Sequence, residues 1–360
     1  MRALLALVTD CYGGNGGLAQ ANRDVFEALA AIVPVDVLPR LAEGVSATPA
    51  GVSQRKAPRS RSAYVASAFA RAWAGRDRYA AVFCGHLHLA PLAEAIHRST
   101  GLPYWLHLHG IEAWRPPSAF LGTAPSARLV TAVSRYTRRR FLSWSEVDPG
   151  RCRLLPDTYD ARFAPGPRSR QLVERYGLAG HRVILTVGRL SSSERYKGHD
   201  RLIVLMPRIL EKVPEALYVI AGGGDDRPYL ASVAERCGVS SKVRFIGRVP
   251  DEDLPDLYRS SDLYVMPSTG EGFGIVFLEA AACGLPVIGG RLDGSADALR
   301  DGLAGTLVDP GNMDELLKAV VGGLQERGAK DVSVFAKPAF AGHARALWGE
   351  FFADRSGSAS

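Results

Sequence analysis

The sequence predicts an α/β protein of two domains, each built on a parallel β-sheet. Short apolar runs alternate with helical segments along the whole chain, which is typical of parallel strands buried on both faces. The length of 360 residues corresponds to two domains of about 100–200 residues each. A stretch at 161–180 contains Pro165-Gly166-Pro167 and shows no periodicity, so we interpret it as the linker.

The composition is that of an ordinary soluble globular protein, with 47% hydrophobic and 22% charged residues. No apolar run reaches the roughly 18–20 residues that a membrane span requires. The first apolar run stops at Thr9-Asp10 without a cleavage site, so we expect a buried strand rather than a signal peptide. Five scattered cysteines without a C-x-x-C pair argue against disulfides or a zinc knuckle and for the cytoplasm.

The net charge of +7 comes entirely from the first half of the chain. Residues 1–160 hold 19 Lys and Arg against 12 Asp and Glu, whereas residues 161–360 hold 25 of each. Two basic runs, at 54–61 and 135–140, carry much of this excess. Such runs are compatible with a peripheral contact to an anionic membrane and equally with a solvated surface. No aromatic-interleaved platform supports a nucleic-acid partner.

The first half begins with a strand, a glycine loop, a helix and a second strand, which is the start of a parallel sheet. A mobile basic loop is expected at 43–62, where Ser, Pro, Arg and Gly recur without a period. Further along we expect a helix at Tyr64–Ala74, a strand, loop and helix at 80–98, a strand and loop at 103–114, a strand and helix at 126–142, and a short strand at 152–157.

The glycine loop allows two interpretations. Residues Gly14 to Ala19 fit the pattern G-x-G-x-x-A, and Asp36 follows at about the spacing of a dinucleotide-binding carboxylate, which indicates a nicotinamide or flavin enzyme. The same loop would also serve as a simpler clamp, with the amides of Gly16 and Gly17 facing a phosphate or a substrate.

Two H-x-H pairs, His86/His88 and His107/His109, allow a metal site in principle, because residues two apart on a strand point the same way. Only Glu112 offers a nearby carboxylate. We favour the interpretation that one member of each pair lies at the carboxyl end of a strand, where open α/β sheets bind ligands.

The second half repeats the alternation and is expected to fold as a unit of its own. Strands are expected at 182–190, 216–221, 242–249, 262–268, 285–290 and 305–309, with helices at the ends of 191–210 and 222–239, at 250–261 and at 312–328. The tail at 337–354 is amphipathic, with its aromatic residues on one face.

The stretch 268–288 carries two glutamates, Glu271 and Glu279, on either side of Gly272-Phe273-Gly274. Glycines allow close approach of the backbone to a ligand, and the following helix start offers free N–H groups. Two carboxylates beside such amides are suited to hold the many hydroxyls of a sugar.

The order of motifs along nearly the whole chain resembles the retaining glycosyltransferases of family 4. The resemblance rests on VGRL followed by K-G, AGGGDDRPYL, VRFIGRVPDEDL, EGFGIVFLE and ACGLPVI in the second half, and on GGNGG, GHLHLAPLA and LHGIEAW in the first. It implies the GT-B fold, in which two Rossmann-like doubly wound domains face a central cleft. The acceptor-side domain would then be 1–160 joined by the helix at 337–354, and the nucleotide-sugar domain 181–336.

The resemblance also implies a role for each matching residue. Arg189 and Lys197 would hold the pyrophosphate, so that neither a metal nor a cofactor is required. Glu279 would bind the ribose and Glu271 the donor hexose. Backbone amides of Gly272, Phe273 and Gly274 would bind sugar hydroxyls and phosphate, and the nucleotide pocket would be lined by Gly222, Arg248 and Val249. From the first half of the chain, Gly16 and Gly17 would approach the phosphates. His109 would lie near the reacting sugar, and Glu112 would contact the sugar or the acceptor.

The implied reaction moves a hexose from a UDP- or GDP-sugar to a hydroxyl of a glycan or lipid-linked acceptor, in cell-surface polysaccharide or glycolipid synthesis. The leaving phosphate would act as the base in a front-face displacement. A cytoplasmic location at the inner face of the membrane is expected. Two alternatives stay open: an NAD(P)-dependent oxidoreductase that uses Gly14 to Ala19, and a binder or phosphorylase of the same fold.

Overall fold

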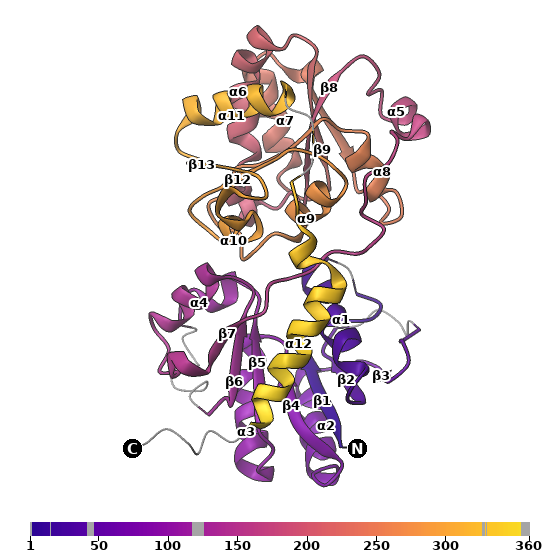
Figure 1. Ribbon diagram of the computed structural model, residues 1–360, viewed down its shortest axis with the longest axis vertical. Coiled ribbons are helices and arrows are strands. Elements are labelled where there is room, and N and C mark those ends of the chain that lie inside the picture. The colour runs from indigo at the N-terminus through magenta and orange to yellow at the C-terminus, as the bar shows by residue number, and fades with distance from the viewer. Residues whose placement is uncertain are drawn as a thin grey trace. The chain divides into compact units, whose positions relative to one another are not determined.

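The computed structural model describes residues 2–14, 16–41, 47–116, 126–325, 328 and 330–353. The chain divides into two compact units, which we call the first unit (Met1–Thr158 with Lys337–Ser360) and the second unit (Tyr159–Ala336). Each unit is a parallel sheet with helices on its faces (Figure 1). The prediction of an α/β protein with two Rossmann-like domains is therefore confirmed.

The sheet of the first unit has the order β3-β2-β1-β4-β5-β6-β7, and all its strand pairs are parallel. Its strands are β1 Ala3–Val8, β2 Val35–Pro39, β3 Val52–Gln54, β4 Tyr79–Cys84, β5 Tyr104–Leu108, β6 Leu129–Ala132 and β7 Cys152–Leu154. The order reverses between β1 and β4. In open α/β sheets, ligands bind beyond the carboxyl ends of the strands at such a reversal.

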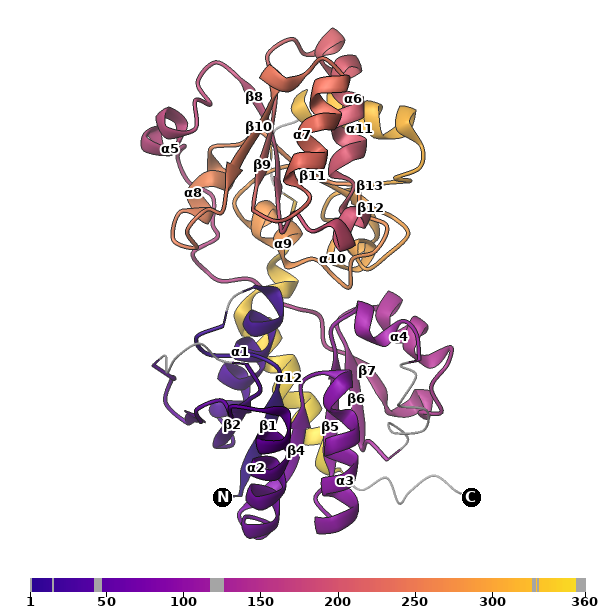
Figure 2. The same cartoon turned by 180° about the vertical axis from the view of Figure 1, so that it is seen from behind.

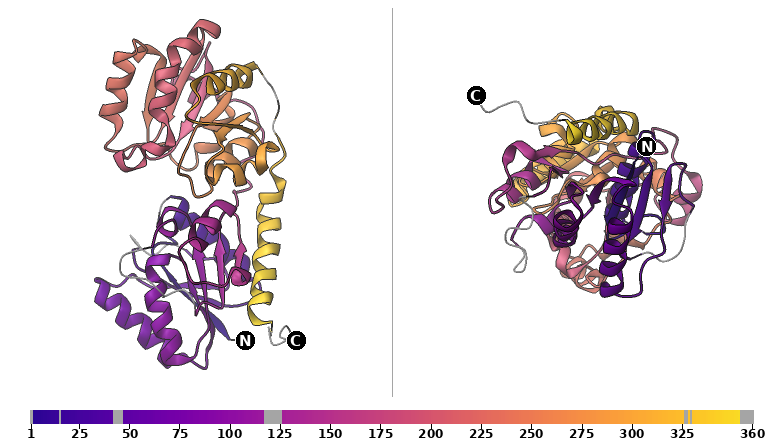
Figure 3. Two further views of the ribbon diagram at one scale, coloured as in Figure 1. Left: turned by 90° about the vertical axis from the view of Figure 1, so that its left-hand side faces the viewer. Right: turned by 90° about the horizontal axis from the view of Figure 1, so that it is seen from below.

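Helices cover both faces of this sheet. They are α1 Gly17–Ala30, α2 Arg61–Ala74, α3 Ala90–Thr100, α4 Arg135–Leu142 and α12 Lys337–Phe352, with short 3₁₀ turns η1 Leu87–Leu89, η2 Ile111–Ala113 and η3 Pro149–Arg151. On one face α1 and α12 lie side by side, and Phe26 and Phe351 pack into one core with Trp105 of β5 (Figures 1 and 3). On the other face α2 and α3 pack against each other (Figure 2). Tyr64 of α2 and Ile96 of α3 belong to the core on that side.

The expectation of a loop at 43–62 is wrong for residues 52–54, which form a strand, and for residues 61–62, which begin α2, while residues 43–46 lie outside the described residues. Residues Val52–Gln54 form β3, which pairs with β2. The Gln54 amide exchanges hydrogen bonds of 2.7 and 3.0 Å with the backbone of Tyr12, and Arg55 forms an ion pair with Asp36 at 3.0 Å. These partners come from distant parts of the chain, so the local composition does not reveal them.

The sheet of the second unit has the order β10-β9-β8-β11-β12-β13, again with parallel pairs. Its strands are β8 Arg182–Val187, β9 Ala216–Ala221, β10 Val243–Gly247, β11 Leu263–Met266, β12 Val287–Gly290 and β13 Thr306–Val308. Its helices are α5 Arg170–Arg175, α6 His199–Lys212, α7 Arg227–Arg236, α8 Leu254–Arg259, α9 Ile275–Ala282, α10 Ser295–Ala298 and α11 Met313–Gln325, with 3₁₀ turns η4 Ser192–Lys197, η5 Ser240–Lys242, η6 Arg300–Gly302 and η7 Ser333–Phe335.

The stretch 161–180, which we interpreted as a linker, lies in the second unit and contains α5. Arg168 forms an ion pair with Asp262 at 2.6 Å, and Arg175 forms one with Asp253 at 3.1 Å. Within the described ranges, no helix is both long enough and apolar enough to cross a bilayer.

Candidate functional site

The predicted donor residues gather at one edge of the second sheet. They lie on the loops that follow the carboxyl ends of β8, β9, β10 and β11, and the strand order reverses between β8 and β11. The parallel strands bring these loops together, because all their carboxyl ends meet at the same edge.

Arg189 and Lys197 lie on the loop after β8 and share one carboxylate. The Arg189 guanidinium donates to one oxygen of Glu194, and the Lys197 ammonium lies 2.8 Å from the other. The Arg189 side chain is 81% exposed, whereas those of Lys197 and Glu194 are only 12% and 11% exposed. Glu194 therefore positions both cations and leaves a net positive charge. Glu194 was not predicted, although it is the sole acidic residue between the two predicted phosphate ligands in the sequence.

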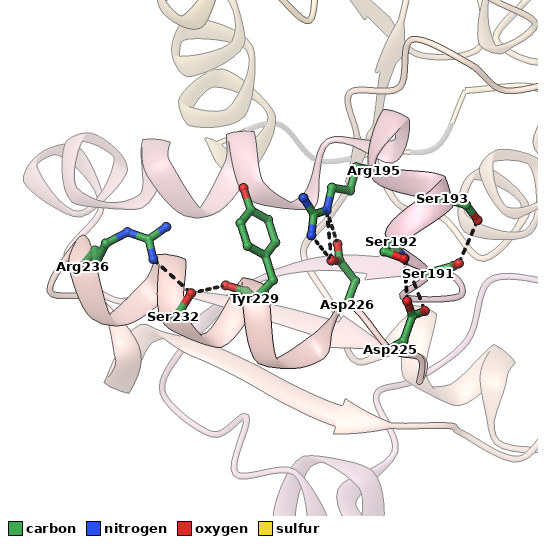
Figure 4. A network of polar contacts seen from close by, with 9 residues as sticks. All are labelled: Ser191, Ser192, Ser193, Arg195, Asp225, Asp226, Tyr229, Ser232 and Arg236. Atoms are coloured by element: carbon green, nitrogen blue, oxygen red, sulfur yellow. Dashed lines mark hydrogen bonds and ion pairs between the residues drawn. The ribbon is translucent and has the colours of Figure 1, made fainter.

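A polar network ties this loop to the loop after β9 (Figure 4). Arg195 donates two hydrogen bonds to the Asp226 carboxylate, from Nε at 3.0 Å and from Nη2 at 2.6 Å. The guanidinium carbon of Arg195 lies 3.8 Å from the centre of the Tyr229 ring. The Ser192 hydroxyl donates to Asp225 over 2.5 Å. Bonds of this kind hold the loop in one conformation, so the cations that it carries are preorganised.

Gly222, which was predicted to line the nucleotide pocket, allows the close approach of these two loops. Its φ is 143°, and a Cβ there would lie 1.8 Å from the carbonyl oxygen of Gly188. Its own N–H donates to the carbonyl of Gly247 over 2.8 Å, which joins the end of β9 to the end of β10. There, Arg248 is exposed and Val249 is buried. The predicted base-reading strip is thus adjacent to the glycine loop.

Glu271 lies on the turn after β11 and is oriented by Asp293. The Asp293 carboxylate accepts the Glu271 N–H at 2.7 Å and the Ser268 hydroxyl at 2.8 Å. Burial raises the pKa of the Glu271 carboxyl to about 7, and the positive charge of Lys197 opposes that rise. Glu271 and the predicted phosphate cations thus lie on loops at the same edge of the sheet, after β11 and β8. Asp293 was not predicted, because it follows the motif and lies 22 residues after Glu271 in the sequence.

Glu279 lies on α9, one turn beyond the amides of Gly272, Phe273 and Gly274 that precede this helix. The Tyr258 hydroxyl donates to one of its carboxylate oxygens over 2.8 Å. Burial raises the pKa of Glu279 to about 7, and the bond from Tyr258 opposes the rise. Because Tyr258 holds one oxygen, the other is the one suited to accept from ligand hydroxyls. Tyr258 lies on α8 and was not predicted.

In the first unit, His109 and Glu112 form a local pair beyond β5. The backbone N–H of His109 donates to Glu112 Oε1 at 2.6 Å. The Nε2 atom of the His109 ring lies 3.0 Å from the carbonyl oxygen of Gly85. Burial lowers the pKa of His109, so the ring is neutral near pH 7. A carbonyl only accepts, so Nε2 carries the proton and Nδ1 is the unprotonated nitrogen. Gly16 is the N-cap residue of α1, and Gly17 is the first residue of that helix.

The metal and dinucleotide hypotheses find no support in this geometry. His107 is buried, and its Nδ1 contacts the Thr131 hydroxyl at 2.8 Å. Within the described part of the chain, no group of three His, Cys, Asp or Glu side chains has the geometry to hold a metal ion. Asp36 is 2% exposed and pairs with Arg55 and with the Tyr79 hydroxyl at 2.6 Å. Its carboxylate thus has a structural role rather than facing a ribose.

Comparison with known proteins agrees with this geometry. Residues 171–330 match the family model described as glycosyl transferases group 1. The chain is 39% identical over 202 residues to the GDP-mannose-dependent alpha-(1-6)-phosphatidylinositol monomannoside mannosyltransferase of Mycolicibacterium smegmatis, which covers 54% of this chain and 52% of that protein. It is 39% identical over 181 residues to the D-inositol 3-phosphate glycosyltransferase of Salinispora arenicola, covering 46% and 40%. The chain thus spans about half the length of the curated relatives it matches.

Solved structures resemble nearly the whole chain. The Anabaena protein HepE in complex with UDP-glucose has a TM-score of 0.73 at 19% identity, covering 96% of this chain and 99% of that one. The sucrose-phosphate synthase of Thermosynechococcus elongatus has a TM-score of 0.72 at 19% identity, covering 98% and 99%. At such identities the likeness establishes the fold. The second unit is thus similar to the glycosyl transferases group 1 over 171–330, and the whole chain has the GT-B fold, as the sequence motifs predicted.

Proposed function

We propose that this protein is a retaining glycosyltransferase that moves a hexose from a nucleotide diphospho-sugar to a hydroxyl of a glycan or lipid-linked acceptor. One observation carries the proposal: two cations joined by Glu194 lie at the same strand edge as the half-buried Glu271 and the amides before α9. Such an edge matches a ligand that is anionic at one end and rich in hydroxyls at the other.

The cations would stabilise the leaving group. As the bond between the anomeric carbon and the β-phosphate oxygen breaks, negative charge develops on the pyrophosphate, and preorganised positive groups lower that barrier. Arg189 offers a fork for two phosphate oxygens, and Lys197 a compact charge. With these side chains in place, the mechanism requires neither a divalent metal nor a cofactor.

The two glutamates would have separate tasks. Glu271 would accept from a hydroxyl of the donor hexose, and Glu279 would bind the ribose hydroxyls through the oxygen that Tyr258 does not hold. The acceptor oxygen would bond to the anomeric carbon on the face that the phosphate leaves, and its proton would pass to the departing β-phosphate. The roles of His109, Glu112, Gly16 and Gly17 near the reacting sugar stay predictions.

The relatives supply the chemical classes of donor and acceptor to be tried. One relative is named as GDP-mannose-dependent with a phosphatidylinositol monomannoside acceptor, and a structural neighbour is described in complex with UDP-glucose. UDP- and GDP-sugars are therefore the donors to screen, with lipid extracts and glycans as acceptors. A role in polysaccharide or glycolipid synthesis, peripheral at an anionic membrane, belongs to the same proposal.

The first test is turnover of UDP- and GDP-sugars by mass spectrometry in Arg189→Ala and Glu279→Ala variants. We expect Arg189→Ala to lower kcat/KM about 10²–10³-fold through lost charge stabilisation. Glu279→Ala should weaken donor binding about tenfold or more, because hydrogen bonds to a charged group are lost. The control Arg208→Ala removes an exposed arginine that pairs with Asp314 on the surface.

Undiminished turnover in both site variants would refute the assignment. Anomeric NMR of the product reports whether configuration is retained, and a chelator leaves the rate unchanged if no metal takes part. Formation of sugar 1-phosphate in the presence of inorganic phosphate would identify a phosphorylase instead. Thermal stabilisation by NAD(H) alone, without an effect of UDP or GDP, would favour the oxidoreductase.

A further inference from the structure

The first unit contains an apolar groove of about 760 Å³ between α2 and α3, which the donor chemistry does not use. Its walls include Val65 and Phe69 from α2 and Leu92 and Ala95 from α3, and Tyr64 is buried beneath them. The Tyr64 hydroxyl lies 3.2 Å from the carbonyl oxygen of Leu38, so the floor is anchored to the sheet. Both helices lie on the same face of that sheet (Figure 2). The volume and apolar lining are those of a ligand site.

The polar end of this groove reaches the histidine cluster at the carboxyl edge of the sheet. His88 lines the groove, and its ring centre lies 4.7 Å from that of His86. The His86 ring centre lies in turn 6.5 Å from that of His109, the residue predicted near the reacting sugar. A molecule whose tail fills the groove would therefore present its head group close to His109.

The charge at the same end is positive. Arg40 follows β2 and Arg61 begins α2, and both line the groove, whereas none of the described residues that line it is acidic. Among the described residues, no ion pair engages either arginine. Beside them Leu41 and Val65 are 59% and 42% exposed, which extends the apolar surface to the rim. An apolar channel with two arginines at its mouth matches an occupant that has a hydrocarbon tail and an anionic head.

We propose that this groove binds the hydrocarbon chain of an anionic lipid acceptor, with the phosphate of its head group at Arg40 and Arg61. The assignment of the lipid as acceptor rests on the proposed function, whereas the binding itself does not. Burial of each additional CH₂ group is expected to tighten binding about fourfold, so the chain supplies the affinity and the arginines supply the selectivity for an anion.

The experiment titrates the full chain with octyl, decyl and dodecyl phosphate by calorimetry, below their micelle-forming concentrations and without a sugar donor. We expect one site whose affinity rises about fifteenfold for every two CH₂ groups. Dodecyl maltoside, which lacks the charge, and inorganic phosphate, which lacks the chain, should each bind at least about tenfold more weakly than dodecyl phosphate.

Two matched pairs of variants locate the site. Ala95→Trp fills the groove and should weaken dodecyl phosphate binding about tenfold or more, while Ala66→Trp, on an exposed position of α2 outside the groove, should not. Arg61→Glu should weaken binding, while Arg59→Glu, exposed and outside the groove, should have little effect. Val65→Glu alters the exposed rim and serves as a second groove variant if Ala95→Trp misfolds.

Binding independent of chain length, or wild-type affinity in both Val65→Glu and Ala95→Trp, would overturn the proposal. So would a dimer that buries this groove and that dodecyl phosphate does not dissociate, since the occupant would then be a second copy of the chain. Titrations with UDP and GDP report on the second unit. If the groove does not bind alkyl phosphates, the UDP and GDP titrations are unchanged. If the protein does not catalyse the proposed transfer reaction, the alkyl phosphate titrations are unchanged.

Discussion

Glu271 and Glu279 have raised pKa values of about 7 because the folded protein surrounds each carboxyl with poorly solvating groups. The opposing influences differ, since Lys197 favours the charged form of Glu271 and Tyr258 that of Glu279. Between an ordinary pKa of 4.5 and about 7, the native state therefore keeps protons that the unfolded state releases. The free energy of unfolding must decrease as the pH rises through this window and stay lower above it.

Glu279→Gln tests this sign at the level of one residue. The amide keeps an acceptor for the Tyr258 hydroxyl but does not ionise, so the variant should gain stability relative to the wild type by about 2 kcal/mol between pH ~5 and pH ~8. Urea denaturation at the two pH values measures the difference. Glu235→Gln, on the exposed face of α7, is the control. If the stability difference between Glu279→Gln and the wild type were the same at both pH values, the raised pKa of the Glu279 carboxyl would be contradicted.

At the scale of elements, the site depends on how closely the strand-end loops approach one another. Gly222 has φ 143°, and a Cβ there would lie 1.8 Å from the carbonyl oxygen of Gly188. At its neighbour Gly223 a Cβ would meet no atom within 4 Å. The two adjacent glycines therefore look alike in sequence but differ in what the fold demands of them.

Gly222→Ala should lower the free energy of unfolding by about 3 kcal/mol, because it forces the loops after β8 and β9 apart. The same displacement moves Arg189 and Lys197 and should weaken UDP or GDP binding. Gly223→Ala should leave both properties nearly unchanged. Chemical denaturation and nucleotide titration of the two variants measure this contrast. Equal effects of the two substitutions would show that the close approach of the two loops at Gly222 contributes neither to stability nor to nucleotide binding.

At the scale of the whole molecule, α12 closes the core of the first unit although it is the last helix of the chain. Phe340, Leu347 and Phe351 are buried against α1 and β5. Lys337 anchors the start of this helix through Asp24 at 3.2 Å and Glu27 at 3.3 Å. The second unit has a separate core, and none of the described residues that form this core belongs to α12.

Truncation after Ala336 should therefore destabilise one unit and spare the other. Loss of three large apolar side chains from a core corresponds to about 5 kcal/mol or more. Hydrogen exchange should show lost protection in α1 and β5, with that of β8 and β9 retained. The control is Phe352→Ser, which changes an exposed side chain at the end of α12 and should have little effect on the protection of α1 and β5. Uniform loss of protection would show that the units do not unfold separately.

The order of strands and helices was predictable because each element leaves its own hydrophobic period in the chain. The helix at Tyr64–Ala74 is recovered as α2, and the buried run at the N-terminus as β1. The strand β3 was not predictable, because only one of its three residues is apolar and it depends on β2 and on the Gln54 bonds to Tyr12. The edge strands β7 and β13 are equally short, but two of the three residues in each are apolar, and both were predicted.

By itself, the sequence determined the two-sheet α/β architecture and the GT-B fold, and it predicted Arg189, Lys197, Glu271 and Glu279 as site residues, because short motifs encode strand-end loops locally. The tertiary structure decided which groups these side chains contact. Glu194 joins the cations, Asp293 orients the Glu271 turn, and Tyr258 occupies one oxygen of Glu279. The apolar groove between α2 and α3 likewise exists only in three dimensions, since packing of distant segments, rather than any local pattern, creates both a shared carboxylate and a cavity.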